Sequence, residues 1–188
     1  MSDANYNFRN ISVSQNIDSG VAEFILLAPV SWFTADGIKS PAAPFDNPGD
    51  SIIIKTPHVF NDGKAWIRYQ LAPQKNELGY KTVGDLGLSK LNAEAKIFIP
   101  GSWPEVHEAV QQWMNRPLLA LQKDANCKAD LWYHLGCDCT FAWMRPEFST
   151  GTTNGGIKGY SIPITYDGPP MFYQVEGGPV ILASESDS

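Results

Sequence analysis

Short apolar runs alternate with polar segments rich in glycine and proline along most of the chain. The run 20-GVAEFILLAPV-30 predicts a buried strand that ends at Pro29, because apolar residues follow one another without polar interruption. Residues 65–72 alternate instead, placing Arg68 and Gln70 opposite Ile67 and Tyr69, which predicts a strand with two different faces. By the same criteria we predict further short strands at 52–56, 93–100, 118–123, 130–136, 138–144, 157–166 and 171–175.

One segment, 102-SWPEVHEAVQQWMN-115, has the period of an amphipathic helix. Ser102 is a suitable N-cap, and Glu105 three residues later completes a capping box. Pro104 falls in the first turn, where its missing N–H costs nothing, and Pro117 prevents continuation. The residues expected on the apolar face are Trp103, Val106, Val110, Trp113 and Met114.

Between and beyond these elements the chain is polar. Residues 34–50 hold three of the fourteen prolines and predict a long loop, and residues 74–90 predict a mobile excursion between two strands. Eight to ten short strands with one helix predict a mainly β fold, a β-sandwich or barrel-like domain with one flanking amphipathic α-helix. We expect this single domain to span residues 20–183, with a flexible N-terminal arm at 1–19 and a polar tail at 184–188.

Composition narrows the classes of partner. Charged residues are only 18% of the 188 residues, so part of the surface is expected to be covered by uncharged polar residues or by other protein chains. The net charge of −6 and the lack of a basic run argue against direct binding of nucleic acid through its phosphates. No signal sequence or apolar run of membrane-spanning length is present, so no membrane partner is expected.

The stretch 126-NCKADLWYHLGCDC-139 holds all three cysteines and raises the question of a metal site. Cys127, His134, Cys137 and Cys139 are ligand types that zinc accepts, but their spacing does not match the usual knuckles. On a strand, Cys137 and Cys139 would point to the same face about 7 Å apart. Zinc binding therefore stays an alternative, and the favoured interpretation is that the thiols pack as small hydrophobic groups, with no metal or cofactor bound.

Enzymatic motifs are lacking in the sequence, so we predict that the protein is not an enzyme. No G-x-S-x-G, P-loop, G-x-G-x-x-G or H-E-x-x-H pattern occurs, and a Cys–His nucleophilic pair would still need an orienting third group. A second alternative is a β-sandwich carbohydrate-binding module that uses some of the six tryptophans. Of these, Trp32 alone is expected near a loop, since the others fit the helix face or strand interiors.

The order of elements, together with four short motifs, resembles a known family. The motifs are 123-KDANCK-128, 135-LG-136, 150-TGT-152 and 159-GY-160, in the last ninety residues. With an apolar first strand, a long loop, a meander and one helix before them, they resemble the major tail tube proteins of tailed bacteriophages and related tail-like ring and tube proteins. Cys127 stands where a turn glycine is usual in that family.

The resemblance implies a structural role in the virion, made in the host cytoplasm and assembled into the phage tail. Subunits would form hexameric rings that stack into a channel, contact other tail or connector proteins, and let DNA pass without specific binding. The acidic balance would keep the channel from holding the DNA. Loops 34–50 and 74–90 and the arm 1–19 would supply the contacts between subunits, and we name as candidate contact residues Asp36, Lys39, Lys75, Lys81 and Asp85.

Overall fold

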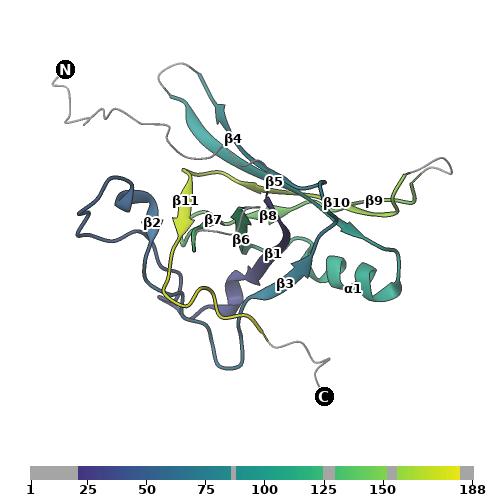
Figure 1. The fold of residues 1–188 in the computed structure, drawn as a ribbon, viewed down its shortest axis with the longest axis horizontal. Coiled ribbons are helices and arrows are strands. Elements are labelled where there is room, and N and C mark those ends of the chain that lie inside the picture. The colour runs from purple at the N-terminus through teal and green to yellow at the C-terminus, as the bar shows by residue number, and fades with distance from the viewer. Residues whose placement is uncertain (1–20, 86–87, 125–129, 152–155, 183–188) are drawn as a thin grey trace.

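The computed structural model describes residues 21–85, 88–124, 130–151 and 156–182. The predicted arm 1–19, the tail 184–188 and most of the predicted turn at 124–127 lie outside these residues. Two β-sheets and one α-helix make up the described fold (Figure 1), so the expected mainly β class with a flanking helix is confirmed. No helix within the described residues is both long and apolar enough to cross a membrane.

The first sheet has six strands in the order β2-β11-β7-β6-β1-β3. All its neighbouring strands run antiparallel except the pair β11 and β2. Their bounds, in sheet order, are Ile53–Ile54, Met171–Tyr173, Trp132–Leu135, Leu118–Asp124, Val21–Pro29 and Ile67–Gln70.

The second sheet has five strands, and all its pairs are antiparallel. Four strands follow the order β4-β5-β10-β8, and β9 pairs with β10 on the same edge as β8. Its strands β4, β5, β10, β8 and β9 span Glu77–Val83, Lys90–Pro100, Gly159–Tyr166, Trp143–Met144 and Glu147–Ser149. Helix α1, Pro104–Trp113, follows β5, and two 3₁₀ turns occupy Val30–Trp32 and Asp50–Ile52.

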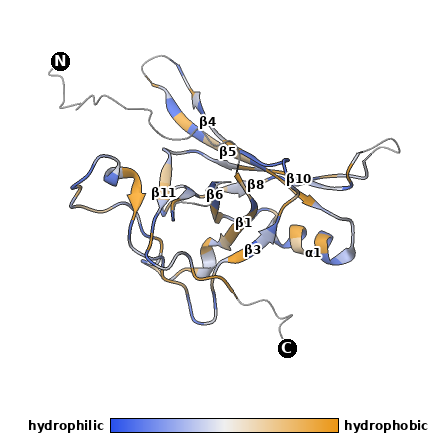
Figure 2. Ribbon diagram, viewed as in Figure 1, coloured by the Kyte–Doolittle hydropathy of each residue, from blue (hydrophilic) through white to orange (hydrophobic). Residues whose placement is uncertain are grey.

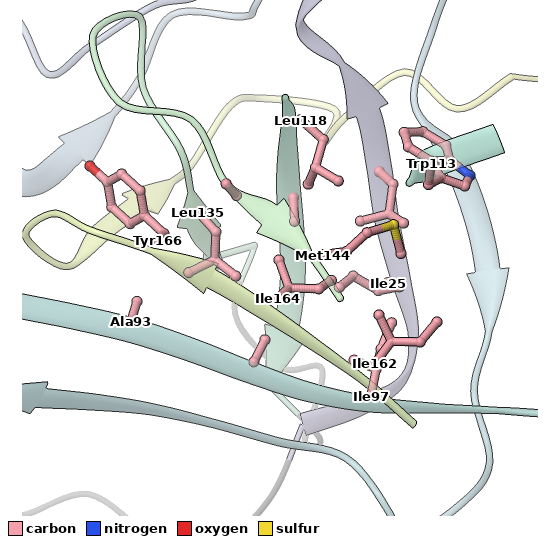
Figure 3. Packing of buried hydrophobic residues seen from close by; sticks show 14 of the residues in the cluster. Ile25, Ala93, Ile97, Trp113, Leu118, Leu135, Met144, Ile162, Ile164 and Tyr166 are labelled. Atoms are coloured by element: carbon pink, nitrogen blue, oxygen red, sulfur yellow. The ribbon is translucent and has the colours of Figure 1, made fainter. Parts of the chain in front are cut away.

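The main core lies between the two sheets, as Figure 3 shows. Ile25 and Leu118 reach it from the first sheet, Ile97 and Ile164 from the second, and Trp113 from α1. All five side chains are less than 5% exposed. Because inward positions alternate along β5 and β10, the opposite positions of these strands form a second, polar face of the sheet.

A second hydrophobic cluster covers the other face of the six-stranded sheet. Leu26 and Leu121 belong to it, whereas their chain neighbours Ile25 and Ala120 face the main core. Strands β1 and β6 are thus buried on both sides, which explains why their sequences are continuous apolar runs. Figure 2 shows the hydrophobic character of β1. The cover over this second face includes Phe33, Ile54 and Trp66, which come from or flank the long segment between β1 and β3.

Two expectations about local structure were wrong. Residues 74–90 contain β4, a seven-residue strand paired with β5, rather than only an excursion between strands. The helix starts at Pro104 with Trp103 as its N-cap and no side-chain capping bond, so Ser102 and Glu105 form no capping box.

The apolar face of the helix is also narrower than expected. Val110 and Trp113 are buried, but Trp103 and Met114 are 67% and 47% exposed. The helix begins two residues later and ends one turn before Pro117, so these two flanking residues leave the face that lies on the core.

Gly136, directly after β7, adopts a backbone conformation that favours glycine and can be tested by substitution. Its φ is +100°, and a Cβ there would lie 3.1 Å from the Leu118 carbonyl oxygen and 3.3 Å from the Ala142 nitrogen. We expect Gly136→Ala to lower the free energy of unfolding by about 1–2 kcal/mol in urea titrations, because an L side chain is strained in this backbone region. Gly79→Ala, in an open strand position, is the control and should leave stability unchanged or slightly higher. Equal effects of the two substitutions would contradict this account.

Candidate functional site

The four candidate zinc ligands do not gather in the described structure. Cys127 lies outside the described residues. Cys137 and Cys139 belong to a turn after β7, closed by a hydrogen bond from the Cys137 N–H to the Thr140 carbonyl (2.7 Å), so the expectation that they share one strand face was wrong. Cys137 packs against the main core and Cys139 is exposed. Within the described residues, no three His, Cys, Asp or Glu side chains are placed to share a metal ion.

His134, the fourth candidate, belongs instead to a buried histidine pair. It lies on β7 with no exposed surface, and its Nε2 is 3.0 Å from the Nε2 of His58, which is 7% exposed. His58 comes from the long segment between β2 and β3 and stacks on Tyr173 of β11 at 5.0 Å between ring centroids. The pair therefore joins this segment to the middle of the six-stranded sheet.

Hydrogen bonding assigns the protons of the histidine pair. The backbone N–H of Lys39 donates to His58 Nδ1 at 2.9 Å, so this nitrogen accepts and the neutral ring carries its proton on Nε2. His58 Nε2–H then donates to His134 Nε2, and the His134 proton is on Nδ1. A metal would need lone pairs from both Nε2 atoms, which this arrangement does not offer. The pair is built to hold two segments together rather than to bind an ion.

Burial keeps both rings neutral. The pKa of His58 is lowered to about 4, mainly by loss of solvation, which the Gly37 backbone partly opposes and to which the nearby Lys39 charge adds a smaller lowering. Burial followed by the charge of His58 also lowers the pKa of His134 well below its ordinary value. Phe33 and Trp66 complete the surroundings of His58, at ring distances of 5.7 Å and 5.9 Å.

The outward face of the sheet formed by β4, β5 and β10 is a second candidate surface. Two ion pairs cross it between adjacent strands, Lys81 with Glu94 at 3.1 Å and Lys96 with Glu77 at 2.8 Å. The Lys96 partnership lowers the pKa of Glu77 and raises that of Lys96. The face is thus polar and locally charge-balanced.

The candidate subunit-contact residues lie in three separate places. Asp36 and Lys39 line a surface hollow of about 520 Å³ beside Asp138. Lys75 lies over the ring of Phe98, 4.9 Å from its centroid. The remaining two, Lys81 and Asp85, are on the β4–β5 hairpin. Their role in assembly stays a prediction.

Sequence reasoning considered His58 only as a possible base, did not pair it with His134, and did not predict the exposed tryptophans. His58 is 76 residues from His134, and no local pattern marks it as a buried residue. Trp103 and Trp143 are 67% and 44% exposed, although the sequence indicated a helix face for the first and a strand interior for the second. The period-two pattern of Glu77, Gly79 and Lys81 was the available signal for a strand with a polar face.

Comparison with known proteins adds no relative. No protein-family model, curated protein or solved structure matches this chain.

Proposed function

We propose that this protein is a structural subunit of a hexameric ring or tube that forms the channel of a phage tail. The observation that carries the proposal is the second sheet, which has one face on the core and one polar face that bears cross-strand ion pairs. A polar sheet face of this kind suits the lining of an aqueous channel. We infer that the subunits are made in the host cytoplasm and function in the virion.

The edge of this sheet supports assembly. Strand β4 is the outermost strand and pairs within the described chain with β5 alone, over seven residues. A free strand edge presents unpaired backbone N–H and C=O groups and favours pairing with another chain. In a ring, β4 of one subunit would pair with the opposite edge of the same sheet in the next, so that both edges of this sheet would be paired.

Charge on the polar face fits the passage of DNA. A surface that binds nucleic acid strongly presents unpaired lysines and arginines to the phosphates. Here Lys81 and Lys96 are each within 3.1 Å of a glutamate oxygen. Because these lysines are paired, they are less available to DNA phosphates. This local effect adds to the repulsion expected from the net charge of −6.

Assembly is the direct test of this proposal. At high protein concentration we expect light scattering to report a species of six 20.7 kDa chains, and electron micrographs to show rings or stacked rings. Strictly monomeric protein, with neither rings nor tubes over the same concentration range, would refute the proposed function.

A further inference from the structure

Two loop segments that cover the second face of the six-stranded sheet pair with each other. The Thr34 N–H donates to the Val59 carbonyl at 3.1 Å, and the Val59 N–H donates to the Gly37 carbonyl at 2.9 Å. We call residues 33–39 and 58–61 the cover unit, because these bonds hold the two segments together as one body.

Little of the cover unit is buried. Phe33, Gly37 and His58 are its buried residues, and the neighbouring residues 55–57 and 62–64 are exposed throughout. Segments with few buried apolar contacts open at a lower free energy than the core of a protein. The cover unit is therefore expected to open more readily than either sheet.

The histidine pair attaches the cover unit to the sheet. His58 donates from Nε2 to the Nε2 of His134 on β7 across 3.0 Å, and its ring stacks on Tyr173 of β11. The Nδ1 of the same ring accepts the Lys39 N–H at 2.9 Å, which fixes the first segment of the cover unit. One side chain thus joins both segments of the cover unit to the sheet.

The surroundings of His58 do not favour a bound proton. Titratable groups face this ring from three elements, namely Lys39 from the cover unit, His134 from β7 and Tyr173 from β11. Among the described residues, Lys39 is the one side-chain charge that shifts the pKa of His58, and it is a cation that lowers it. The Gly37 carbonyl favours the protonated ring, but it already accepts a backbone N–H. Protonation of Nδ1 therefore breaks the bond from the Lys39 N–H and gains little in return.

We propose that the histidine pair makes the cover unit an acid-operated switch, which separates from the six-stranded sheet in mildly acidic solution while both sheets stay folded. In the opened state the two rings reach water and bind protons freely, so each bound proton favours the opened state. Opening would uncover Phe33 and Trp66, which are now 6% and 1% exposed. It would also dismantle the surface hollow that Asp36 and Lys39 help to line. The switch goes beyond the ring function and does not depend on it.

Hydrogen exchange of the full-length protein at pH 7 and at pH 4.5 tests the switch. After correction for intrinsic exchange rates, the opening equilibrium at the Lys39 and Val59 amides should rise roughly 50-fold at the lower pH, because His58 regains its ordinary pKa on opening. This opening should be insensitive to low concentrations of urea, since a local opening exposes little surface. The amides of β1 and β6 should open in a strongly urea-dependent way.

A double variant tests whether the histidines are the source of the effect. His58→Asn with His134→Leu removes both titrating rings, and an asparagine oxygen can still accept the Lys39 N–H. Opening of the cover unit should then become independent of pH. Tyr173→Phe is the matched control, because it keeps both histidines and the ring that stacks on His58, and it should retain the increase at low pH.

Three results would overturn the switch. Opening at Lys39 and Val59 that does not change with pH in the wild-type protein is the first, and a pH dependence that persists in the double variant is the second. The third is opening at these amides that shares the urea sensitivity of the β1 and β6 amides, which would mean that acid unfolds the whole domain. The first and third results need only wild-type protein, so the switch stays testable if the double variant does not fold.

Discussion

Lowering the pH from 7 to 4.5 will reduce the free energy of unfolding by about 2 kcal/mol from His58 alone and by more from the pair, because both buried histidines must stay neutral in the folded protein. The pKa of His58 falls from its ordinary value of 6.5 to about 4 on folding, and that of His134 moves in the same direction. Between these pH values the two histidines bind protons in the unfolded chain but remain unprotonated in the folded chain. Stability is therefore complete above about pH 6.5 and is lost as the pH falls toward 4.

The structural consequence of protonation is specific. A proton added to His58 Nδ1 would face the Lys39 N–H that this nitrogen now accepts, so the hydrogen bond that anchors the loop would be lost. Urea titrations at several pH values measure the effect. Carboxylates contribute at lower pH, since salt-bridged groups such as Glu77 have lowered pKa values and lose their contribution mainly below about pH 4.

Two variants isolate the histidine pair. The double substitution His58→Leu with His134→Leu removes both titrating groups together and should flatten the dependence of stability on pH between 6.5 and 4.5. Tyr173→Phe, which keeps the ring that stacks on His58 and removes no histidine, should leave that dependence intact. If the double variant keeps the slope of the wild-type protein, the histidine pair is not its source.

Replacing Trp66 by alanine will cost about 3–5 kcal/mol of stability, the usual range for removing a buried aromatic ring. Trp66 is 1% exposed and contacts the rings of Phe33, Phe60 and His58. Its backbone also accepts the N–H of Leu182 and donates to the carbonyl of residue 180. The cavity would loosen the cover over the second face of the six-stranded sheet.

Trp143→Ala is the matched control for this substitution. Trp143 is 44% exposed on the polar side of the second sheet, so its loss should change the unfolding free energy by less than about 1 kcal/mol. Urea titration compares the two variants, and hydrogen exchange should show faster opening at residues 33–37 and 58–61 in Trp66→Ala alone. Comparable losses in both variants would mean that Trp66 does not hold this cover in place.

Several parts of the fold followed from local pattern. Strand β1 and strand β6 were expected because apolar runs of their length must be buried on both faces. Helix α1 was expected from its period, with Val110 and Trp113 confirmed on the core. Strand β4 was missed, because its glycine and lysine content resembles a loop and its outward positions contact no core.

What the sequence by itself determined was therefore the class of the fold, the strands with a buried face, and the polar character of the remainder. Tertiary structure alone decided that His134 meets His58 rather than the cysteines, and that Trp103 faces solvent while Trp113 faces the core. The physical reason is the separation along the chain over which each interaction acts. Hydrophobic periodicity acts between neighbours in the chain, whereas the partner of a buried polar group is chosen by whichever distant strand or loop packs against it.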